Sequence, residues 1–424
     1  MSDVCLIYLP KPYLNQPDAQ APLGLMYIAA SIEQHSLYKC EIMNFSTYTD
    51  DQAIEELPAA RLYGITVTSL EVLHANRFAK RIKKKYGDVK IILGGPGVYA
   101  KEFIDFSVID SIMYGDGEHK IFDVLMDYPD LKKEYKGFVY NLDSLPFPAR
   151  HKLKSQGGNI FAYNKKYADG ESTIITTSRG CPMKCAFCSA PSLTNKQLRF
   201  RSIENVIKEI KEVKEKYNIR QFRFSDDFFT VYEERVLEFC KQIKRLNVFW
   251  RVSTRVKPLS EYMLKAMKDA GCTELSFGIE SFDDDVLKGL KKGCTARDNI
   301  EALELADKVG IDTRILMMIR TPFQNEKTIK LNKTYLTNVP HTIAACTAFI
   351  PIPGCDIWNN PEKYNIEILD KDLDKYNFYM FGPDGRRPLD KIFRIKDRCI
   401  NEFHQESEQF RDWLENDYKK INRG

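Results

Sequence analysis

The sequence has little excess of charge of either sign and no long hydrophobic run. Its 424 residues carry 63 basic and 59 acidic side chains, a net charge of +4, whereas nucleic-acid-binding proteins usually show a strong basic patch. No stretch approaches the ~20 apolar residues that span a bilayer. Asp3 stands where a secretory leader would be basic, and Pro10 ends the first apolar run. We therefore expect a cytoplasmic protein without membrane insertion or nucleic-acid binding.

The sequence also lacks a regular, even set of cysteines. The chain has 11 cysteines, an odd number spread over a long sequence without a secretion signal, which argues against a disulfide framework. Most of them stand alone. Cys181, Cys185 and Cys188 instead form a C-x3-C-x2-C cluster that needs its own explanation.

Residues 1–130 alternate short apolar segments with helical patterns. Apolar strands separated by helices are typical of a parallel sheet that is covered on both faces. The predicted fold class is therefore α/β, beginning with a Rossmann-like doubly wound parallel sheet that binds ligands beyond the carboxyl ends of its strands. The strands are predicted at residues 4–9, 40–45, 61–68, 89–93 and 111–114, and the helices at 23–34 and 70–86.

A second series of strands and helices is predicted over residues 171–360, after a linker at 131–170 that contains Pro146 and Pro148. Its clearest helix is expected at 203–217, with Ser202 as the N-cap. The spacing fits a partial (βα)6 TIM-type barrel with its chemistry at the carboxyl ends of the strands. A small α-rich C-terminal extension is expected at 361–424. The barrel strands are predicted at 173–177, 221–225, 249–254, 273–278, 313–318 and 343–350.

The three clustered cysteines follow the first strand of the second series. Thiolates bind soft metals, and an iron–sulfur cubane takes one cysteine per iron when it is fully ligated. Three cysteines on one loop therefore predict a [4Fe–4S] cluster whose fourth iron needs an outside ligand. The alternatives are an incidental cluster and structural zinc, which takes four ligands, usually as two pairs. The next Cys or His residues, Cys240 and His151, are distant in the sequence.

With this loop the sequence resembles the radical S-adenosylmethionine (SAM) superfamily, and more narrowly its members with an N-terminal cobalamin-binding domain. The resemblance extends to about residue 360, and the cysteine loop is its most specific part. The other motifs, in family order, are Ala21-Pro-Leu-Gly-Leu-Met-Tyr-Ile28, Leu93-Gly-Gly-Pro96, Gly115-Asp-Gly-Glu118, Ser144-Leu-Pro-Phe-Pro-Ala149, Arg199-Phe-Arg-Ser202, Asp226-Asp-Phe-Phe229, Gly278-Ile-Glu-Ser281 and Pro351-Ile-Pro-Gly354.

The resemblance implies that SAM chelates the open iron through its amino and carboxylate groups. Reductive cleavage of SAM then gives a 5′-deoxyadenosyl radical that removes hydrogen from an unactivated carbon, and the cofactors supply the difficult chemistry. The implied partners are a small-molecule or peptide-derived substrate and an electron donor of the flavodoxin or ferredoxin type.

The resemblance also implies where SAM binds. Phe187 is expected near the adenine. Ser225, Asp226 and Asp227 end the second barrel strand, where the main chain meets the SAM amino group in this family. The alternative for the two aspartates is that they cap the next helix.

Three further SAM positions end the next two barrel strands. Ser253 and Arg255 are expected to bind the ribose and the carboxylate, since a guanidinium matches a carboxylate bidentately. Glu280 is expected to bind the ribose or the amino group. The alternative for Arg255 and Glu280 is an ion pair at the barrel rim.

The N-terminal domain is expected to bind cobalamin through loops at its strand ends, where glycine lets the backbone approach a ligand closely. The motif Asp-x-His-x-x-Gly, which supplies a histidine to cobalt in other cobalamin proteins, is absent, so a histidine ligand is not expected. Some relatives keep the domain without using cobalamin, which leaves this prediction open. The candidate residues are Thr66, Thr68, Ser69, Gly94, Gly95, Gly115, Gly117 and Glu118.

Three residues depart from the family pattern near the expected opening of the active site. Arg320 and Phe282 stand where small residues are common, and Arg320 is a candidate catalytic residue that would contact an anionic group of the substrate. The alternative is that both side chains point outward. Cys355 stands where threonine is common. It is a candidate redox or radical-relay thiol, and the alternative is that it packs in the core.

Three functions are consistent with these features. The first is a cobalamin-dependent radical SAM methyltransferase. The second is a radical SAM cyclase, mutase or oxidase without methyl transfer, with cobalamin present or lost. The third is a non-catalytic metal- or nucleotide-binding module, which the three-ligand motif disfavours because structural metal sites are normally closed by four ligands.

Overall fold

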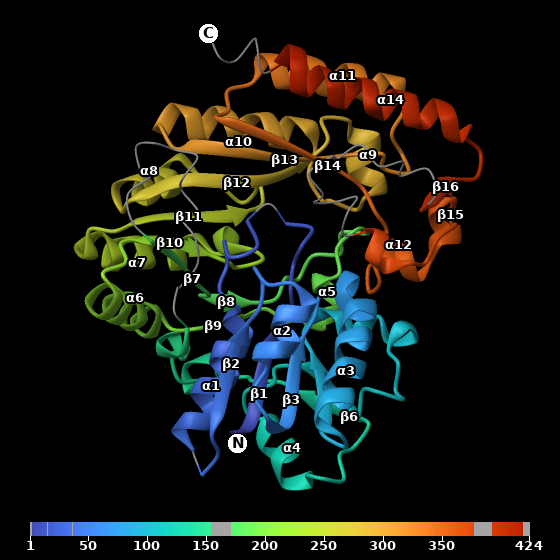
Figure 1. The fold of residues 1–424 in the computed structure, drawn as a ribbon. Coiled ribbons are helices and arrows are strands. Elements are labelled where there is room, and N and C mark those ends of the chain that lie inside the picture. Colours follow the sequence, from blue (N-terminus) through green and yellow to red (C-terminus); the bar gives the residue numbers. More distant parts are fainter. Residues whose placement is uncertain (1, 15, 36, 154–170, 377–391, 419–424) are drawn as a thin grey trace.

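The computed structural model describes all residues except 1, 15, 36, 154–170, 377–391 and 419–424. Two six-stranded sheets dominate it. In Figure 1 the first sheet, in blue and cyan, lies below the second, which runs from green to orange, and the C-terminal helix lies at the top. Among the described residues, no helix has both the length and the apolar character that crossing a membrane requires.

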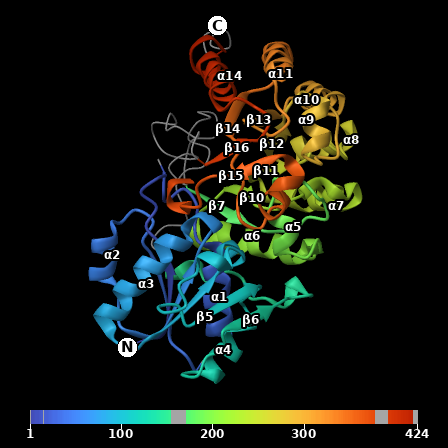
Figure 2. The same cartoon turned by 90° about the vertical axis from the view of Figure 1, so that its right-hand side faces the viewer.

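The first sheet is doubly wound and entirely parallel. Its order is β2-β1-β3-β4-β5-β6. Helices α2 and α3 cover one face and α1 and α4 cover the other (Figure 2). The strands are β1 (Ser2–Tyr8), β2 (Cys40–Asn44), β3 (Ala60–Thr66), β4 (Lys90–Gly94), β5 (Ser111–Gly115) and β6 (Glu134–Gly137), and the helices are α1 (Leu23–Gln34), α2 (Asp50–Glu56), α3 (Val72–Tyr86) and α4 (Ile121–Asp127).

The five strands predicted for this domain are all present, and the structure adds a sixth. β6 pairs with β5 at the sheet edge, inside the range expected to be linker. It was missed because only Tyr135 of its four residues is buried, so no apolar run marks it. Residues 154–170, the rest of the predicted linker, lie outside the described residues.

The strand order places a ligand crevice in this sheet. The chain moves from β1 to β2 on one side and to β3 on the other side of β1. In open α/β sheets, ligands bind beyond the carboxyl ends of the strands at such a switch point. Here that edge faces the second sheet.

The second sheet is the predicted partial barrel. Its parallel strands follow chain order, β7-β10-β11-β12-β13-β14, and helices α7, α8 and α10 lie on its outer side (Figure 2). Helix α6 has the predicted bounds, and Ser202 Oγ accepts from Asn205 N at 3.1 Å. The strands are β7 (Ser172–Ile175), β10 (Gln221–Phe224), β11 (Phe249–Thr254), β12 (Cys272–Glu280), β13 (Asp312–Ile319) and β14 (Ile343–Ala348), and the helices are α6 (Ile203–Tyr217), α7 (Glu233–Ile243), α8 (Glu261–Asp269), α10 (Ala296–Val309) and α11 (Glu326–Asn338).

Shorter elements complete the carboxyl ends of the barrel and the extension. The extension is less helical than predicted, because β15 and β16 pair antiparallel before α14 begins. Phe410 packs in the barrel core, whereas Phe393 packs in the core of the first domain. These elements are β8 (Ser178–Arg179), α5 (Ala190–Leu193), β9 (Arg199–Phe200), α9 (Asp284–Gly289), α12 (Asp356–Asn359), β15 (Ile366–Ile368), β16 (Phe393–Ile395) and α14 (Ile400–Asp412).

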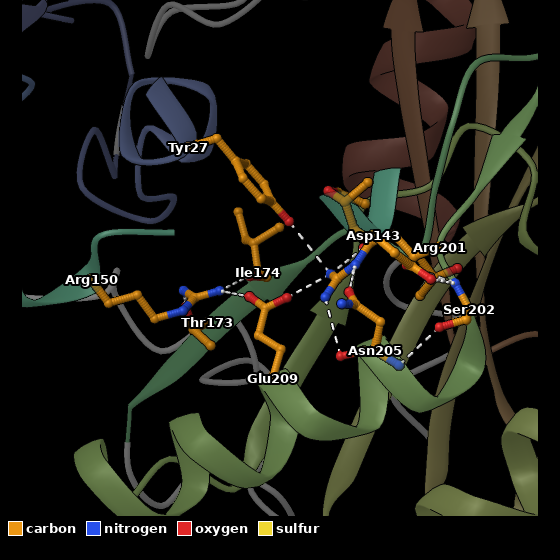
Figure 3. A network of polar contacts seen from close by, with 12 residues as sticks. Tyr27, Asp143, Arg150, Thr173, Ile174, Arg201, Ser202, Asn205 and Glu209 are labelled. Atoms are coloured by element: carbon orange, nitrogen blue, oxygen red, sulfur yellow. Dashed lines mark hydrogen bonds and ion pairs between the residues drawn. The ribbon is translucent and has the colours of Figure 1, made fainter. Parts of the chain in front are cut away.

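A buried ion network joins the two domains (Figure 3). Arg150, which follows the first domain, donates to Glu209 Oε1 of α6 and to Thr173 Oγ1 of β7, both at 2.7 Å. Arg201 donates to Glu209 Oε2 at 2.5 Å and to Thr176 O at 2.8 Å. One buried carboxylate therefore bridges two buried guanidinium groups along the first barrel strand, from Thr173 to Thr176.

Candidate active site at the barrel mouth

The three clustered cysteines lie on one loop at the carboxyl end of β7, after the short strand β8. Cys185 is buried and the other two are half-buried. A turn joins Cys188 N to Cys185 O at 3.2 Å, and Ala186 N donates to Leu290 O at 2.9 Å. Burial raises the pKa of Cys181 and raises that of Cys188 to about 12, and a bound iron would deprotonate such thiols.

The number of thiols bears on the choice between a cluster and zinc. Among the residues that the structure describes, no group of three or more His, Cys, Asp or Glu side chains is assembled around a single ion position. Structural zinc takes four ligands, whereas an iron–sulfur cubane takes one cysteine per iron. Three cysteines on one loop fit a cubane with one iron left open.

Predicted SAM residues from two strands meet beside this loop. Arg255, just beyond β11, places Nη1 3.5 Å from Cys185 Sγ and also donates to Lys292 O. Lys292 Nζ bonds Glu280 Oε1, at the end of β12, at 2.8 Å, and lies 5.7 Å from the Phe187 ring centroid. The structure thus brings Arg255, Glu280 and Phe187 together around a lysine that the sequence analysis missed.

Glu280 itself is held in an unusual backbone conformation. Its φ is +62°, in the left-handed region that non-glycine residues seldom adopt. Such conformations cost energy and concentrate at functional sites. Its side chain pairs with Lys292, so the ion-pair alternative holds for Glu280 with a different partner from Arg255. Ser253, on β11, is half-buried.

The residues that end β10 divide into two roles. Asp226 is buried, and its carboxylate accepts from Thr177 N and Ser178 Oγ, both at 2.7 Å. It fixes the entry to the cysteine loop, so the alternative that this side chain caps the next helix does not hold. The expected main-chain contact with SAM stays a prediction. Ser225 and Asp227 are exposed and line a cavity.

This cavity, of about 430 Å³, lies between the carboxyl edge of the first sheet and the cysteine loop. It sits at the switch point, because Leu6 of β1 and Thr66 of β3 both line it. A groove of about 530 Å³ shares Tyr99, Gly115 and Phe138 with it. The polar lining from the barrel side consists of Thr176, Ser178, Arg179, Arg199, Ser225 and Asp227.

Most of the predicted cobalamin positions line this cavity. A side chain at Gly24 would meet no atom within 4 Å, and one at Gly94 would meet only Met113 Cβ at 3.9 Å, so these glycines widen the cavity. The predicted positions along the wall are Thr66, Gly94, Gly95, Gly115, Gly117 and Glu118.

Three of the predicted cobalamin residues bond to protein groups. Thr68 begins a 3₁₀ turn, where its main-chain N–H donates to Glu71 Oε2 at 2.8 Å. Ser69 is buried, and its hydroxyl donates to Pro353 O at 3.3 Å. Glu118 reaches the wall, but its carboxylate accepts from Arg179 Nη2 at 2.6 Å. In this structure these residues fix loops.

The residues that depart from the family pattern are buried. Arg320 and Phe282 are each 1% exposed, so neither side chain points into solvent. Arg320 has a φ of +63° at the end of β13, and Phe282 packs against Tyr335 with ring centroids 5.2 Å apart. Cys355 is fully buried and its Sγ accepts from Trp358 N at 3.3 Å, which favours packing and helix capping over a redox role.

Comparisons with known proteins agree with this geometry. Residues 175–331 match the model of the Radical SAM superfamily. An uncharacterized methyltransferase of Pyrococcus horikoshii is 29% identical over 80% of this chain and 77% of its own. The bacteriochlorophyllide d C-12(1)-methyltransferase of Chlorobaculum tepidum is 24% identical over 88% and 81%.

A solved structure shares the whole fold. The radical SAM methyltransferase TsrM of Kitasatospora setae, with cobalamin and a [4Fe–4S] cluster bound, aligns with a TM-score of 0.71 at 14% identity, covering 97% of this chain and 88% of its own. The two chains therefore share the two-domain fold.

Proposed function

Because the chain belongs to the radical SAM superfamily, we propose that it is a cobalamin-dependent methyltransferase acting on an unactivated carbon. The observation that carries this proposal is the cavity at the switch point, whose barrel-side wall includes Arg179 and Gly180, the two residues before Cys181. Named methyltransferases that are similar over at least 80% of the chain support it. We place the enzyme in the cytoplasm, with a flavodoxin- or ferredoxin-type donor as its partner.

Cys181, Cys185 and Cys188 would hold the [4Fe–4S] cluster, which when bound supplies the electron for cleavage of SAM. Arg255 balances thiolate charge at Cys185, and its fork of N–H donors suits the carboxylate of SAM. Glu280 is held in place by Lys292 to receive the amino or ribose groups. Phe187, Ser225, Asp227 and Ser253 complete the proposed SAM site.

The edge of the first sheet would hold cobalamin, which when bound carries the methyl group. Backbone at Gly94, Gly95, Gly115 and Gly117, with the hydroxyl of Thr66, provides a wall that a large flat ligand can approach closely. Histidine is absent from the described residues that line the cavity. Cobalamin bound here would therefore lack a histidine ligand from the cavity wall.

Arg320 supports a preference for an anionic substrate. It is a fully buried cation at the carboxyl end of β13, where barrel enzymes place their active-site residues. The left-handed backbone at this position is consistent with a functional constraint. No step is assigned to Cys355.

The experiment compares the products of SAM in the anaerobically reconstituted protein with and without hydroxocobalamin. A methyltransferase uses one SAM for the radical and another for the methyl group, so the reduced, cobalamin-loaded enzyme should release both 5′-deoxyadenosine and S-adenosylhomocysteine. A cyclase, mutase or oxidase should release only 5′-deoxyadenosine. Failure to retain cobalamin under saturating conditions, or absence of S-adenosylhomocysteine, would overturn the methyltransferase proposal.

A further inference from the structure

A second link between the domains lies immediately before the cluster cysteines. Strands β8 and β9 form a short antiparallel ladder in which Arg179 lies directly opposite Arg199. Like charges opposite each other destabilise a ladder. Asp116, at the end of β5, lies between them: its Oδ1 accepts from Arg179 Nη1 at 2.8 Å and its Oδ2 accepts from Arg199 Nη1. The ladder of the second domain is thus neutralised by a carboxylate of the first.

Glu118 adds a second carboxylate to the same guanidinium. It is 3% exposed and accepts from Arg179 Nη2 at 2.6 Å, so Arg179 bonds two acidic residues of one loop. The Tyr27 ring lies 5.1 Å from the guanidinium carbon of Arg179, and the Phe138 ring lies 3.9 Å from that of Arg199. Charge-assisted bonds of this kind are the stronger and more directional ones.

We call the bonds of Asp116 and Glu118 to Arg179 and Arg199 the clamp. The backbone between Arg179 and the cluster cysteines has little freedom. Gly180 is the one residue between Arg179 and Cys181, and its φ is +99°. A Cβ there would lie 2.0 Å from Gln197 O, so the chain is tightly packed on the segment that precedes β9. A displacement of Arg179 would therefore be passed on to the first cluster cysteine.

We propose that Asp116 and Glu118 are positioning residues for the iron–sulfur cluster, which fix the entry to the cysteine loop through Arg179. The loop from Gly115 to Glu118 also forms part of the cavity wall, so one loop of the first domain faces the cavity and sets the cluster loop. The inference rests on the radical SAM part of the proposed function. It does not depend on cobalamin.

A clamp that merely joins the domains would be redundant, because the network of Arg150, Glu209 and Arg201 already joins them (Figure 3). That network contacts β7, Thr176 and α6. Asp116 and Glu118 bond instead to Arg179, which lies two residues before Cys181. Loss of the clamp is therefore expected to change the cluster and its reaction with SAM more than the stability of the fold.

The test uses the full chain, reconstituted anaerobically without cobalamin, and compares wild type with Asp116→Asn/Glu118→Gln. The readouts are iron per chain, the change in the electron paramagnetic resonance spectrum of the reduced cluster on adding SAM, and 5′-deoxyadenosine formed per chain. Glu71→Gln is the control: Glu71 is 1% exposed and ion-paired, and its partners Lys11, Tyr13 and Thr68 all belong to the first domain.

We expect the double variant to fold, by circular dichroism of the apoprotein, but to lose about 10- to 100-fold in 5′-deoxyadenosine formation, the usual cost of removing an outer-shell partner. Its spectral response to SAM should also shrink. Glu71→Gln should keep the wild-type rate of 5′-deoxyadenosine formation and the wild-type spectral response to SAM, even if its melting temperature falls. If the double variant does not fold, Glu118→Gln alone, which retains Asp116 between the arginines, is judged by the same readouts.

Wild-type iron content, spectral response and rate in the folded variant would overturn the proposal. Equal losses in Glu71→Gln would overturn it as well, because they would trace the effect to stability. Since no cobalamin is present, neither outcome bears on the methyltransferase proposal, and failure to bind cobalamin leaves this test intact.

Discussion

Arg255 is the residue whose position most directly predicts a contact with SAM. Its guanidinium lies 3.5 Å from Cys185 Sγ and is held by Lys292 O. We expect Arg255→Leu to retain the cluster but to raise the KM for SAM about 10- to 100-fold, as loss of an outer-shell partner does. Arg255→Lys keeps the positive charge but lacks the forked N–H donors of a guanidinium. Its KM for SAM should lie between those of wild type and Arg255→Leu. An unchanged KM in Arg255→Leu would remove this residue from the SAM site.

Variants of Cys355 test whether this cysteine is structural or reactive. Its Sγ accepts from the first turn of α12, and Cys355→Ser preserves an acceptor there. We expect this variant to form 5′-deoxyadenosine at the wild-type rate. Cys355→Val should lower the free energy of unfolding by about 1 kcal/mol through loss of the cap. A folded Cys355→Ser protein that cleaves SAM but gives no further turnover would restore the radical-relay hypothesis.

Single residues were predictable from the sequence only where spacing or chain order specified their chemistry. The cysteines and Arg255 met that condition. Lys292 did not, because a loop brings it to Glu280 from 12 residues away. The partners of the Asp226 and Glu118 carboxylates were not predictable either, because a carboxylate at a strand end has the same sequence context whether it meets a ligand or a neighbouring loop.

Helix α12 provides a pH test at the scale of an element. Burial would raise the pKa of Asp356, but hydrogen bonds from Lys291 and Tyr364 outweigh it and lower the pKa from 3.8 to about 2. A depressed carboxyl pKa adds stability above the unfolded value and loses it as pH falls through the folded value. The contribution should therefore disappear between about pH 4 and pH 2.

Asp356→Asn measures this contribution in denaturant unfolding of the apoprotein. Since the side chain is 33% exposed, we expect a loss of about 1 kcal/mol near neutral pH, well below the full linkage value. The gap from wild type should close near pH 2. A gap that persists at low pH would show that the pKa of Asp356 is not depressed by these bonds.

Elements were predictable where the apolar pattern was continuous or periodic. β13 has a continuous apolar run, β10, β11 and β12 alternate apolar and polar residues, and α6 buries residues at the helical period. β6 and β16 were not predicted, because they are short edge strands with a polar side that are defined by pairing with distant segments. Strand order was not predicted for the same reason, because it depends on which distant segments pair.

The joint between the domains can be tested by its contribution to stability. Glu209 bonds Arg150 and Arg201 in the interior (Figure 3), so Glu209→Gln removes the buried carboxylate that these two guanidinium groups share. We expect a loss of about 3–5 kcal/mol in denaturant unfolding, the usual cost of breaking a buried pair from one side. Glu212→Gln, on the same helix, removes only an exposed pair with Lys216 and should cost under about 1 kcal/mol. Equal effects would contradict a structural role for this network.

The central claim is that three cysteines hold a cluster whose open iron activates SAM. The most direct measurement is iron content and 5′-deoxyadenosine release in anaerobically reconstituted wild type beside a Cys181→Ala/Cys185→Ala/Cys188→Ala variant. We predict about four irons per chain and reductant-dependent 5′-deoxyadenosine in wild type, and neither in the variant. A wild-type protein that takes up zinc instead of iron and never cleaves SAM would contradict the account.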